Sequence, residues 1–204
     1  GYQVNTHAIG DSAVSLVLKI YSEYLKGKND LRWRIEHAQI VNPLDLPIFG
    51  AYSIIPSVQA THATSDMKWA PDRLGRRRIK WAYAYKNLLD QNGWLPNGTD
   101  FPVEKINPLL TFYAAVSRQD ITSFPEKGFQ PENALSRVEA LKSITIWAAK
   151  AGFDENSRGS IDIGKMADFV ILDHDILTCP LSEIPSTKVL MTVIGGEKVI
   201  NNLK

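Results

Sequence analysis

The chain repeats one pattern that strongly limits its fold: a strand-like run ends in a polar side chain and is followed by a helical pattern. The first run, residues 2–7, alternates apolar and polar side chains and ends at His7, and residues 11–25 then carry an apolar stripe at helical spacing. A second run, residues 31–37, ends at His37. Strands that alternate with helices along a chain predict parallel βαβ units.

The pattern continues in the same order before it changes character. We expect strands at residues 52–58 and 94–99, a polar loop at 59–74, and helices at 43–50, 76–89, 108–117 and 136–151, the last opened by a capping box. The final third instead predicts a turn-rich segment at 159–165, a buried strand at 169–172 and a hairpin at 188–200. The sequence therefore predicts an α/β fold with a larger domain at residues 1–152 and a small β subdomain at 153–204.

Composition excludes several classes of partner. The chain has 204 residues, enough for one large domain, and its net charge of +1 gives no reason to expect nucleic acid or a membrane surface as a partner. The basic run Arg76–Arg78 is predicted to be a solvated helix face. No run of about 18 apolar residues is present, so no transmembrane span is predicted. A single cysteine excludes an internal disulfide and is typical of a reducing compartment such as the cytoplasm.

Asp100 closes the short fourth run, and Pro102 behind it would end strand pairing because proline has no N–H to donate. An aspartate in this place can be a metal ligand, a general base or a turn former. His7 and His37 hold equivalent places on earlier strands, and the carboxyl ends of parallel strands gather at one edge of a sheet. Two imidazoles and a carboxylate are a suitable ligand set for Zn²⁺ or a similar ion. The alternative is that each histidine is an ordinary hydrogen-bonded structural residue.

Polar and aromatic side chains of the predicted loop are open to two interpretations. His62 is either a substrate contact or an ordinary polar loop residue. The same alternatives, substrate contact or structural residue, apply to Trp69 and Arg73.

Two further charged positions are predicted to be structural. Glu36 has the opposite parity to His37 along its strand, so we expect it to face the helix layer and to pair with Arg32 or Arg34. His174 follows the last predicted β/α unit, and we expect it on the surface of the β subdomain.

Four segments carry a recognisable set of motifs, in the order Val4–Asp11, Arg34–Gln39, Ser57–Asp66 and Gly98–Glu104. Together they resemble the amidohydrolase superfamily, and more narrowly amidohydrolase family 3, which includes N-substituted formamide deformylase-like metal-dependent hydrolases. The segment Gly159–Asp173 is similar to the closing segment of that family, so the resemblance covers essentially the whole chain.

The resemblance implies the second half of a (β/α)₈ TIM-like barrel, strands five to eight, followed by a small β-sandwich. It implies that His7, His37 and Asp100 are ligands of a divalent metal, expected to be Zn²⁺, and that Asp100 is also the proton shuttle. The side chains expected to contact a small-molecule substrate are His62, Trp69 and Arg73. By the same likeness, the first of them would polarise the substrate carbonyl.

Strands one to four of such a barrel, with the His-x-His pair and the bridging Lys or Glu that they carry, have no counterpart in this sequence. The chain also begins inside a predicted strand, so we expect it to be cut from a longer one. The resemblance implies part of a hydrolase that acts on a C–N bond in an amide or N-acyl group, weakly active or inactive by itself. We expect a partner, either the missing N-terminal half or a second copy, to cover the open strand edges. The alternative is a non-catalytic binding or regulatory module derived from such an enzyme.

Overall fold

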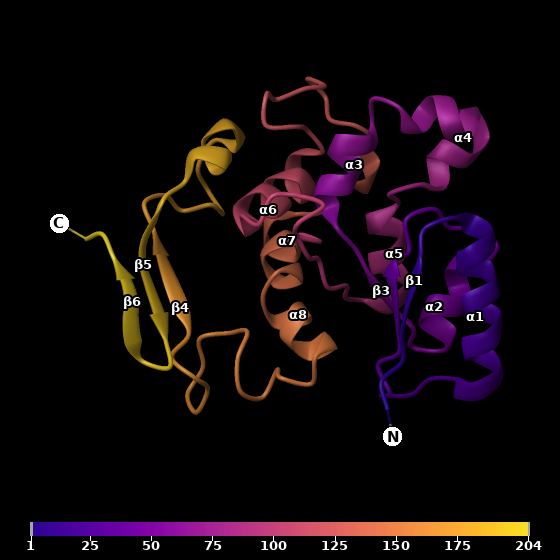
Figure 1. Ribbon diagram of the computed structural model, residues 1–204, viewed down its shortest axis with the longest axis horizontal. Coiled ribbons are helices and arrows are strands. Elements are labelled where there is room, and N and C mark those ends of the chain that lie inside the picture. Colours follow the sequence, from indigo (N-terminus) through magenta and orange to yellow (C-terminus); the bar gives the residue numbers. More distant parts are fainter. Residues whose placement is uncertain (1, 204) are drawn as a thin grey trace.

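The computed structural model describes residues 2–203 and contains two sheets with helices beside and between them (Figure 1). The first sheet is parallel, with strands in the order β1 (Asn5–Ala8), β2 (Arg34–His37) and β3 (Ile55–Ser57). The second is antiparallel, in the order β4 (Phe169–Leu172), β5 (Val189–Ile194) and β6 (Glu197–Asn201). The predicted α/β class is confirmed, while the half-barrel and the sandwich stay predictions.

Apolar residues at strand and helix spacing explain how the first sheet is covered. In Figure 1 α1 (Asp11–Leu25) and α2 (Leu46–Ala51) lie on its right-hand side, and α5 (Tyr85–Asn92) contacts α2. Ile35 in β2 and the α1 residues Val14 and Leu18 have no exposed surface and belong to one core cluster. Fully burying one such side chain contributes about 1.5–3 kcal/mol.

The fourth predicted strand, residues 94–99, is reduced to one parallel bridge between Val58 and Asn97. Val58 donates its N–H to the carbonyl of Pro96 (3.0 Å) and accepts the N–H of Gly98 (2.9 Å). Because Pro96 itself has no N–H to donate, the pairing cannot extend along the segment. The bridge nevertheless places this segment beside β3, so Asp100 reaches the same edge of the sheet as the residues after β2 and β3.

The segment predicted as a polar loop, residues 59–74, is helical, so that prediction was wrong. It forms α3 (Ala60–Asp66) and the start of α4 (Ala70–Arg78). The helix predicted at 76–89 is interrupted: α4 is followed by the 3₁₀ turn η1 (Ile79–Trp81) and then by α5. The N–H of Tyr83 donates to the carbonyl of Gln39 (2.7 Å), which holds the chain out of a helix between η1 and α5.

Of the remaining predicted helices, one is continuous and one is divided. The helix predicted at 108–117 is α6 (Pro108–Ser117), and Asn107 caps it by accepting the N–H of Leu109. The predicted helix at 136–151 is divided into α7 (Arg137–Ser143) and α8 (Ile146–Ala151), because Thr145 lies outside the helical region at φ −127° and ψ −99°. A 3₁₀ turn, η2 (Pro131–Asn133), precedes them. No helix within residues 2–203 is both long enough and apolar enough to cross a membrane.

The predicted capping box at the start of α7 is present in full, and its loss should be measurable. Ser136 accepts the N–H of Glu139 through its hydroxyl (3.2 Å), and Glu139 accepts the N–H of Ser136 through its carboxylate (2.8 Å). We expect Ser136→Ala to lower the free energy of unfolding by about 1 kcal/mol. Urea denaturation monitored by circular dichroism would measure the change. Ser12→Ala, an exposed serine in the first turn of α1, is the control, and an equal loss in both variants would contradict the capping role.

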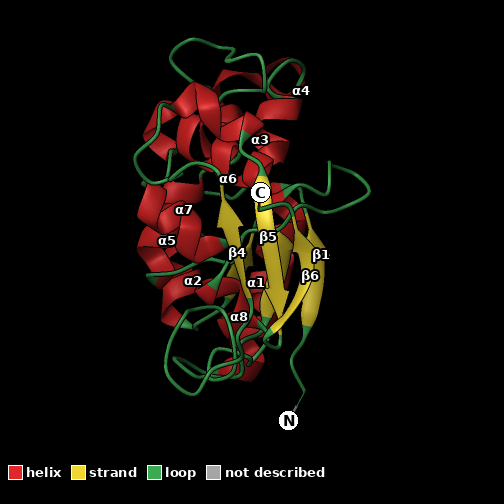
Figure 2. Ribbon diagram, turned by 90° about the vertical axis from the view of Figure 1, so that its left-hand side faces the viewer, coloured by secondary structure: helices red, strands yellow, loops and turns green. Residues whose placement is uncertain are grey.

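The last third forms the predicted hairpin, but its first strand is not buried. Gly195 and Gly196 both have positive φ (58° and 86°) in the two-residue turn between β5 and β6, as expected for a type I′ hairpin. The prediction of a buried strand at 169–172 was wrong, since Phe169, Val170 and Ile171 are 37%, 52% and 37% exposed. Figure 2 shows this sheet facing the viewer, in front of the helices. Apolar side chains of this sheet are therefore left exposed among the described residues.

The segment between β4 and β5 links this sheet to the rest of the chain. It contains the 3₁₀ helix η3 (Leu181–Ser186), and its Ile176 and Ile184 are buried in the same core cluster as the helices of the larger part. Arg137 donates to the carbonyls of Ile176 and Cys179, both at 2.6 Å. The division at residue 152 stays a prediction.

Candidate metal centre

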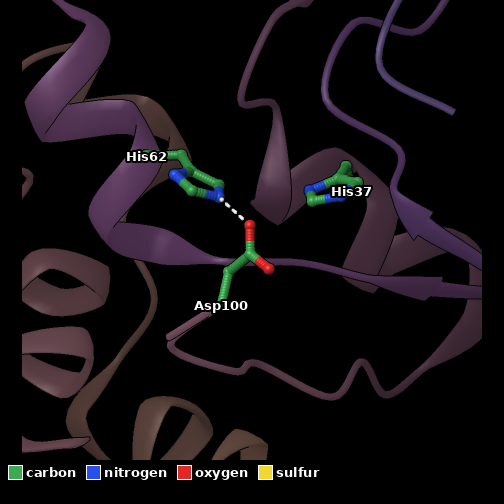
Figure 3. A group of neighbouring side chains, drawn as sticks. All are labelled: His37, His62 and Asp100. Carbon is green, nitrogen blue, oxygen red and sulfur yellow. Dashed lines mark hydrogen bonds and ion pairs between the residues drawn. The ribbon is translucent and has the colours of Figure 1, made fainter. Parts of the chain in front are cut away.

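Three side chains from different elements converge at the carboxyl ends of the parallel strands (Figure 3). His37 is the last residue of β2, His62 lies in α3, and Asp100 follows the segment that bridges to β3. Each offers one ligand atom, and these atoms all lie within 4.8 Å of one another. Figure 3 shows the Asp100 carboxylate between the two imidazoles. The structure thus joins residues that are far apart in the sequence.

An unusual backbone conformation turns two of these side chains toward each other. His37 and Asp100 have φ values of +77° and +56°, and Ala38 after the histidine has +43°. Residues other than glycine adopt this left-handed region rarely and at a cost of order 1 kcal/mol or more, typically at functional sites. At Asp100 the turn closes by a hydrogen bond from the N–H of Val103 to the Asp100 carbonyl (2.8 Å).

The same conformation explains why the predicted orientation of Glu36 was wrong. In the sheet register Glu36 lies beside His7, and the neighbouring Ile35 is the residue buried against the helices. Glu36 therefore faces away from the helix layer, and His37 escapes the strand alternation through its positive φ. The expected ion pair is present, since Arg34 donates to Glu36 at 2.8 Å.

The surroundings of His37 favour a neutral ring with one nitrogen free. Its Nδ1 lies 2.9 Å from the side-chain oxygen of Gln59, an acceptor that can hold the ring proton there. The pKa of His37 lies below its ordinary value; burial is the larger cause and the nearby His7 ring is the second. A neutral imidazole whose Nδ1 carries the proton presents the lone pair of Nε2, which is the form that binds a metal.

His62 stands between two carboxylates. Its Nε2 lies 3.2 Å from Oδ2 of Asp100, and its Nδ1 lies 3.3 Å from Oε1 of Glu104. The His62 residue is only 7% exposed, so its imidazole contacts these groups largely out of water. The Asp100 side chain keeps 34% of its surface exposed and can exchange protons with solvent.

Two of the three predicted metal ligands belong to the cluster, with His62 as its third member. His7, the other predicted ligand, lies beside it: the His7 and His37 ring centroids are 4.5 Å apart in an edge-to-face arrangement. His62, predicted as a substrate contact, is 5.8 Å from His37 by the same measure. The ligand and substrate assignments of all these residues stay predictions.

The other predicted substrate contacts lie on α4. Trp69 precedes the helix and is 50% exposed, and Arg73 is exposed in its first half. Within residues 2–203, neither side chain forms a hydrogen bond or an ion pair, so the structure does not connect them to the cluster. His174 lies apart on the β subdomain, where it contacts Asp173 (2.8 Å) and Glu183 (3.7 Å).

Two supporting residues were not assigned a role from sequence. Gln59 contacts His37 through its side chain and accepts the Tyr85 hydroxyl on its carbonyl (2.8 Å), which fixes the residue from both ends. Glu104 contacts His62. Its spacing of four residues from Asp100 across a proline turn was the only available signal, and such a spacing alone does not predict a contact.

A buried network lies next to the cluster. Asp66, one helical turn after His62, accepts hydrogen bonds from Tyr83 (2.8 Å) and Gln39 (3.2 Å). Burial raises the pKa of Asp66, and burial together with the Asp66 contact raises the pKa of Tyr83. These bonds fix the loop after β2 against α3, which holds the elements of His37 and His62 together.

The donor set fits a divalent cation of the zinc class. Imidazole nitrogen and carboxylate oxygen are usual zinc ligands, and three protein ligands leave a position for water or substrate. The short mutual separation of the three ligand atoms and the second contact on each imidazole are what such a site requires.

Comparison with known proteins gives consistent matches. The sequence profile described as "Amidohydrolase family" matches residues 1–200. Protein LONG AFTER FAR-RED 3 of Arabidopsis thaliana is 38% identical over 98% of this chain and 34% of its own length. N-substituted formamide deformylase of Arthrobacter pascens is 25% identical over 96% of this chain and 36% of its own length.

A solved structure is also similar. An uncharacterized metal-dependent hydrolase from Pyrococcus horikoshii superposes with a TM-score of 0.76 and 31% identity, over 88% of this chain and 35% of that one. The chain therefore spans about a third of the length of the proteins that it matches.

Proposed function

We propose that this chain, which belongs to the amidohydrolase family, forms part of a metal-dependent hydrolase. The enzyme would cleave a C–N bond in an amide or N-acyl substrate. The family and its metal-dependent hydrolase neighbour support a hydrolase role. The observation that carries the proposal is the convergence of His37, His62 and Asp100 within 4.8 Å. The relative that deformylates N-substituted formamides supports a C–N bond as the target.

His37, His62 and Asp100 would hold the cation, which we propose to be Zn²⁺, with His7 beside them. When bound, such an ion lowers the pKa of a water molecule to about 7 and polarises a carbonyl oxygen. The chain itself contributes a neutral His37, favoured by burial and by the nearby His7 ring, which lower its pKa, while Gln59 can hold the ring proton on Nδ1.

Proton transfer in this proposal belongs to Asp100. Its carboxylate is partly exposed and stands beside an imidazole, so it can accept a proton from the attacking water and donate it to the departing nitrogen. If His62 instead has the substrate-contact role that the resemblance implies, its Nε2 beside this carboxylate would polarise the substrate carbonyl in place of holding the cation. A positioned group of this kind contributes about 10²–10⁴-fold to a rate.

The test combines metal binding with hydrolysis. Equilibrium dialysis of the chain against Zn²⁺ should give bound metal, although weakly. Release of formate from a panel of N-substituted formamides, and of amine from N-acyl compounds, should be slight for the chain alone. It should rise when the remaining part of a related amidohydrolase is co-expressed with it. A chain that binds no Zn²⁺ in either condition would contradict the proposal.

One flank of α1 indicates where such a partner would bind. Ser15 bonds Asp45 at the start of α2 on one flank, but Leu16, Ile20 and Tyr24 on the opposite flank are 58%, 44% and 71% exposed. β1 beside this helix is an edge strand. A helix with an apolar flank next to an open edge fits a further β/α segment, from an N-terminal half or a second copy.

Charge on this flank should block association. We expect the chain to associate in solution, and Ile20→Glu to shift it to monomer because a carboxylate would be buried in the contact. Size-exclusion chromatography with light scattering measures the mass. Lys19→Glu, at an exposed position on the polar face, is the control. A well-folded monomer before any substitution would contradict self-association and leave an N-terminal half as the partner.

A further inference from the structure

We propose that a cavity between the start of α1, the loop after β2 and the end of α4 binds a small carboxylate with an aromatic body. The cavity has a volume of about 290 Å³ and shares no lining residue with the candidate metal centre. Arg77 and Trp81 both line it, and they contact the carboxylate and the ring of the ligand, respectively. Binding at this place does not depend on the proposed hydrolysis.

The basic run Arg76–Arg78 reaches this cavity after a kink in α4. The kink is at Gly75, whose φ of 69° and ψ of 171° form a combination that essentially only glycine adopts. All three arginines after it are exposed, but Arg77 and Arg78 also line the cavity, whereas Arg76 does not. The run is therefore more than a solvated helix face.

An ion pair and a backbone hydrogen bond hold the walls of the cavity together. Arg78 donates from Nε and Nη2 to the two carboxylate oxygens of Asp11, each at 2.9 Å, which joins the end of α4 to the start of α1 below it in Figure 1. The N–H of Val41 donates to the carbonyl of Trp81 at 3.0 Å, which joins the loop after β2 to η1. The cavity is therefore formed before a ligand binds, and binding need not order its walls.

The polar side chains of the lining leave donors free and no carboxylate free. The only carboxylate among the described lining residues, Asp11, is already paired with Arg78. Within residues 2–203, the guanidinium of Arg77 and the indole N–H of Trp81 have no hydrogen-bond partner. The side-chain oxygen of Asn42 is occupied by a backbone N–H, which leaves its amide NH₂ to donate. A carboxylate satisfies such donors, and a guanidinium can bind it through two parallel hydrogen bonds.

The rest of the lining is apolar and selects the body of the ligand. Ile40 and Val41 are buried, Trp81 is half-buried, and Leu44 is exposed. A ring that lies among them removes its own surface and part of the Leu44 and Trp81 surfaces from water, and a ring beside an indole gains a further aromatic contact. The volume is close to the lower limit of ligand pockets, about 300 Å³, so the cavity fits a single ring.

Titration of the chain with phenylacetate, followed by NMR of the amide and indole N–H groups, tests the inference. The indole N–H of Trp81 and the backbone N–H of Val41 should shift until saturation, with a Kd of about 1 mM or lower. The indole N–H of Trp94, which lies against Lys150 of α8, should not shift. Phenylethanol, which lacks the charge, and acetate, which lacks the ring, should each bind at least about tenfold more weakly.

Two variants of the basic run separate recognition by Arg77 from the effect of net charge. Arg77→Gln should weaken phenylacetate binding about tenfold, because it removes the charge that pairs with the carboxylate. Arg76→Gln, which loses the same charge outside the cavity, is the matched control and should bind as the unmodified chain does. Both positions are exposed, so neither change should disturb the fold.

Several outcomes would overturn the inference. Unchanged binding by Arg77→Gln, or an equal loss in both variants, would show that this guanidinium does not recognise the carboxylate. Equally tight binding of phenylethanol or of acetate would show that the charge or the ring is not recognised. Shifts at Trp81 and Val41 when the chain is concentrated, with no response to phenylacetate, would assign the cavity to a contact between copies.

Discussion

Replacement of His37 by alanine is expected to weaken Zn²⁺ binding at least about 100-fold, because loss of a direct ligand should cost more than loss of a supporting contact. His37 is in the three-residue cluster, and its ring is kept neutral by burial. His7 lies next to it, with ring centroids 4.5 Å apart, but does not belong to the three-residue cluster. Isothermal titration with Zn²⁺, or metal analysis after dialysis, measures the loss.

The chain offers a matched control for this experiment. His174 is a histidine on the β subdomain, paired with Asp173 and distant in sequence from the cluster. His174→Ala should therefore bind Zn²⁺ as the unmodified chain does. Equal loss in both variants would indicate non-specific binding to surface histidines. Absence of metal from the unmodified chain would instead favour a non-catalytic module.

Sequence patterns located the elements that local chemistry determines. Ser136 predicts a helix start because its side chain bonds a free N–H group of the first turn, and this cap is present. The glycine pair at 195 and 196 predicts its hairpin because the turn needs two residues with positive φ. In these places a few neighbouring residues contain all the information that the structure uses.

Helix α3 could not be predicted from its own residues. It has no side-chain cap, and it contains two β-branched threonines, which favour helices weakly. Packing against the rest of the protein stabilises this helix. It lies beside α6 (Figure 1), and four of its residues are buried: Ala60, His62, Ala63 and Thr64. The sequence therefore predicted a loop at the segment that carries His62.

The sequence predicted which residues gather at the candidate site better than it predicted how their side chains are oriented. A histidine at the end of β2 and an aspartate after the fourth run predicted that His37 and Asp100 would meet, because parallel strands end at a common edge. Which side chains share a face was not predictable, because His37 and Asp100 adopt positive φ values that strand alternation does not anticipate. That difference reversed the orientation of Glu36 and hid the role of Glu104.

Substitution of Asp100 by asparagine is expected to lower the hydrolytic rate about 10²–10⁴-fold at saturating Zn²⁺, the contribution of a positioned acid–base group. Asparagine keeps the size and an acceptor oxygen, but its amide cannot take a proton from water and deliver it to the leaving nitrogen. Saturating metal is needed because Asp100 is also a candidate ligand. The assay is formate release by the chain together with its completing partner.

The comparison that isolates this role is Asp90→Asn, which removes an exposed carboxylate on α5 that pairs with Lys86 at 3.4 Å. We expect that variant to retain the unmodified rate. The Asp100 variant should lose kcat while KM changes little, because the lost interaction belongs to the proton transfer and not to substrate binding. A rate within about threefold of the unmodified protein would remove Asp100 from the mechanism, since even the weakest general acid–base contribution is about 10²-fold. The carboxylate would then be left with the alternative that its sequence also allowed, a turn former ahead of Pro102.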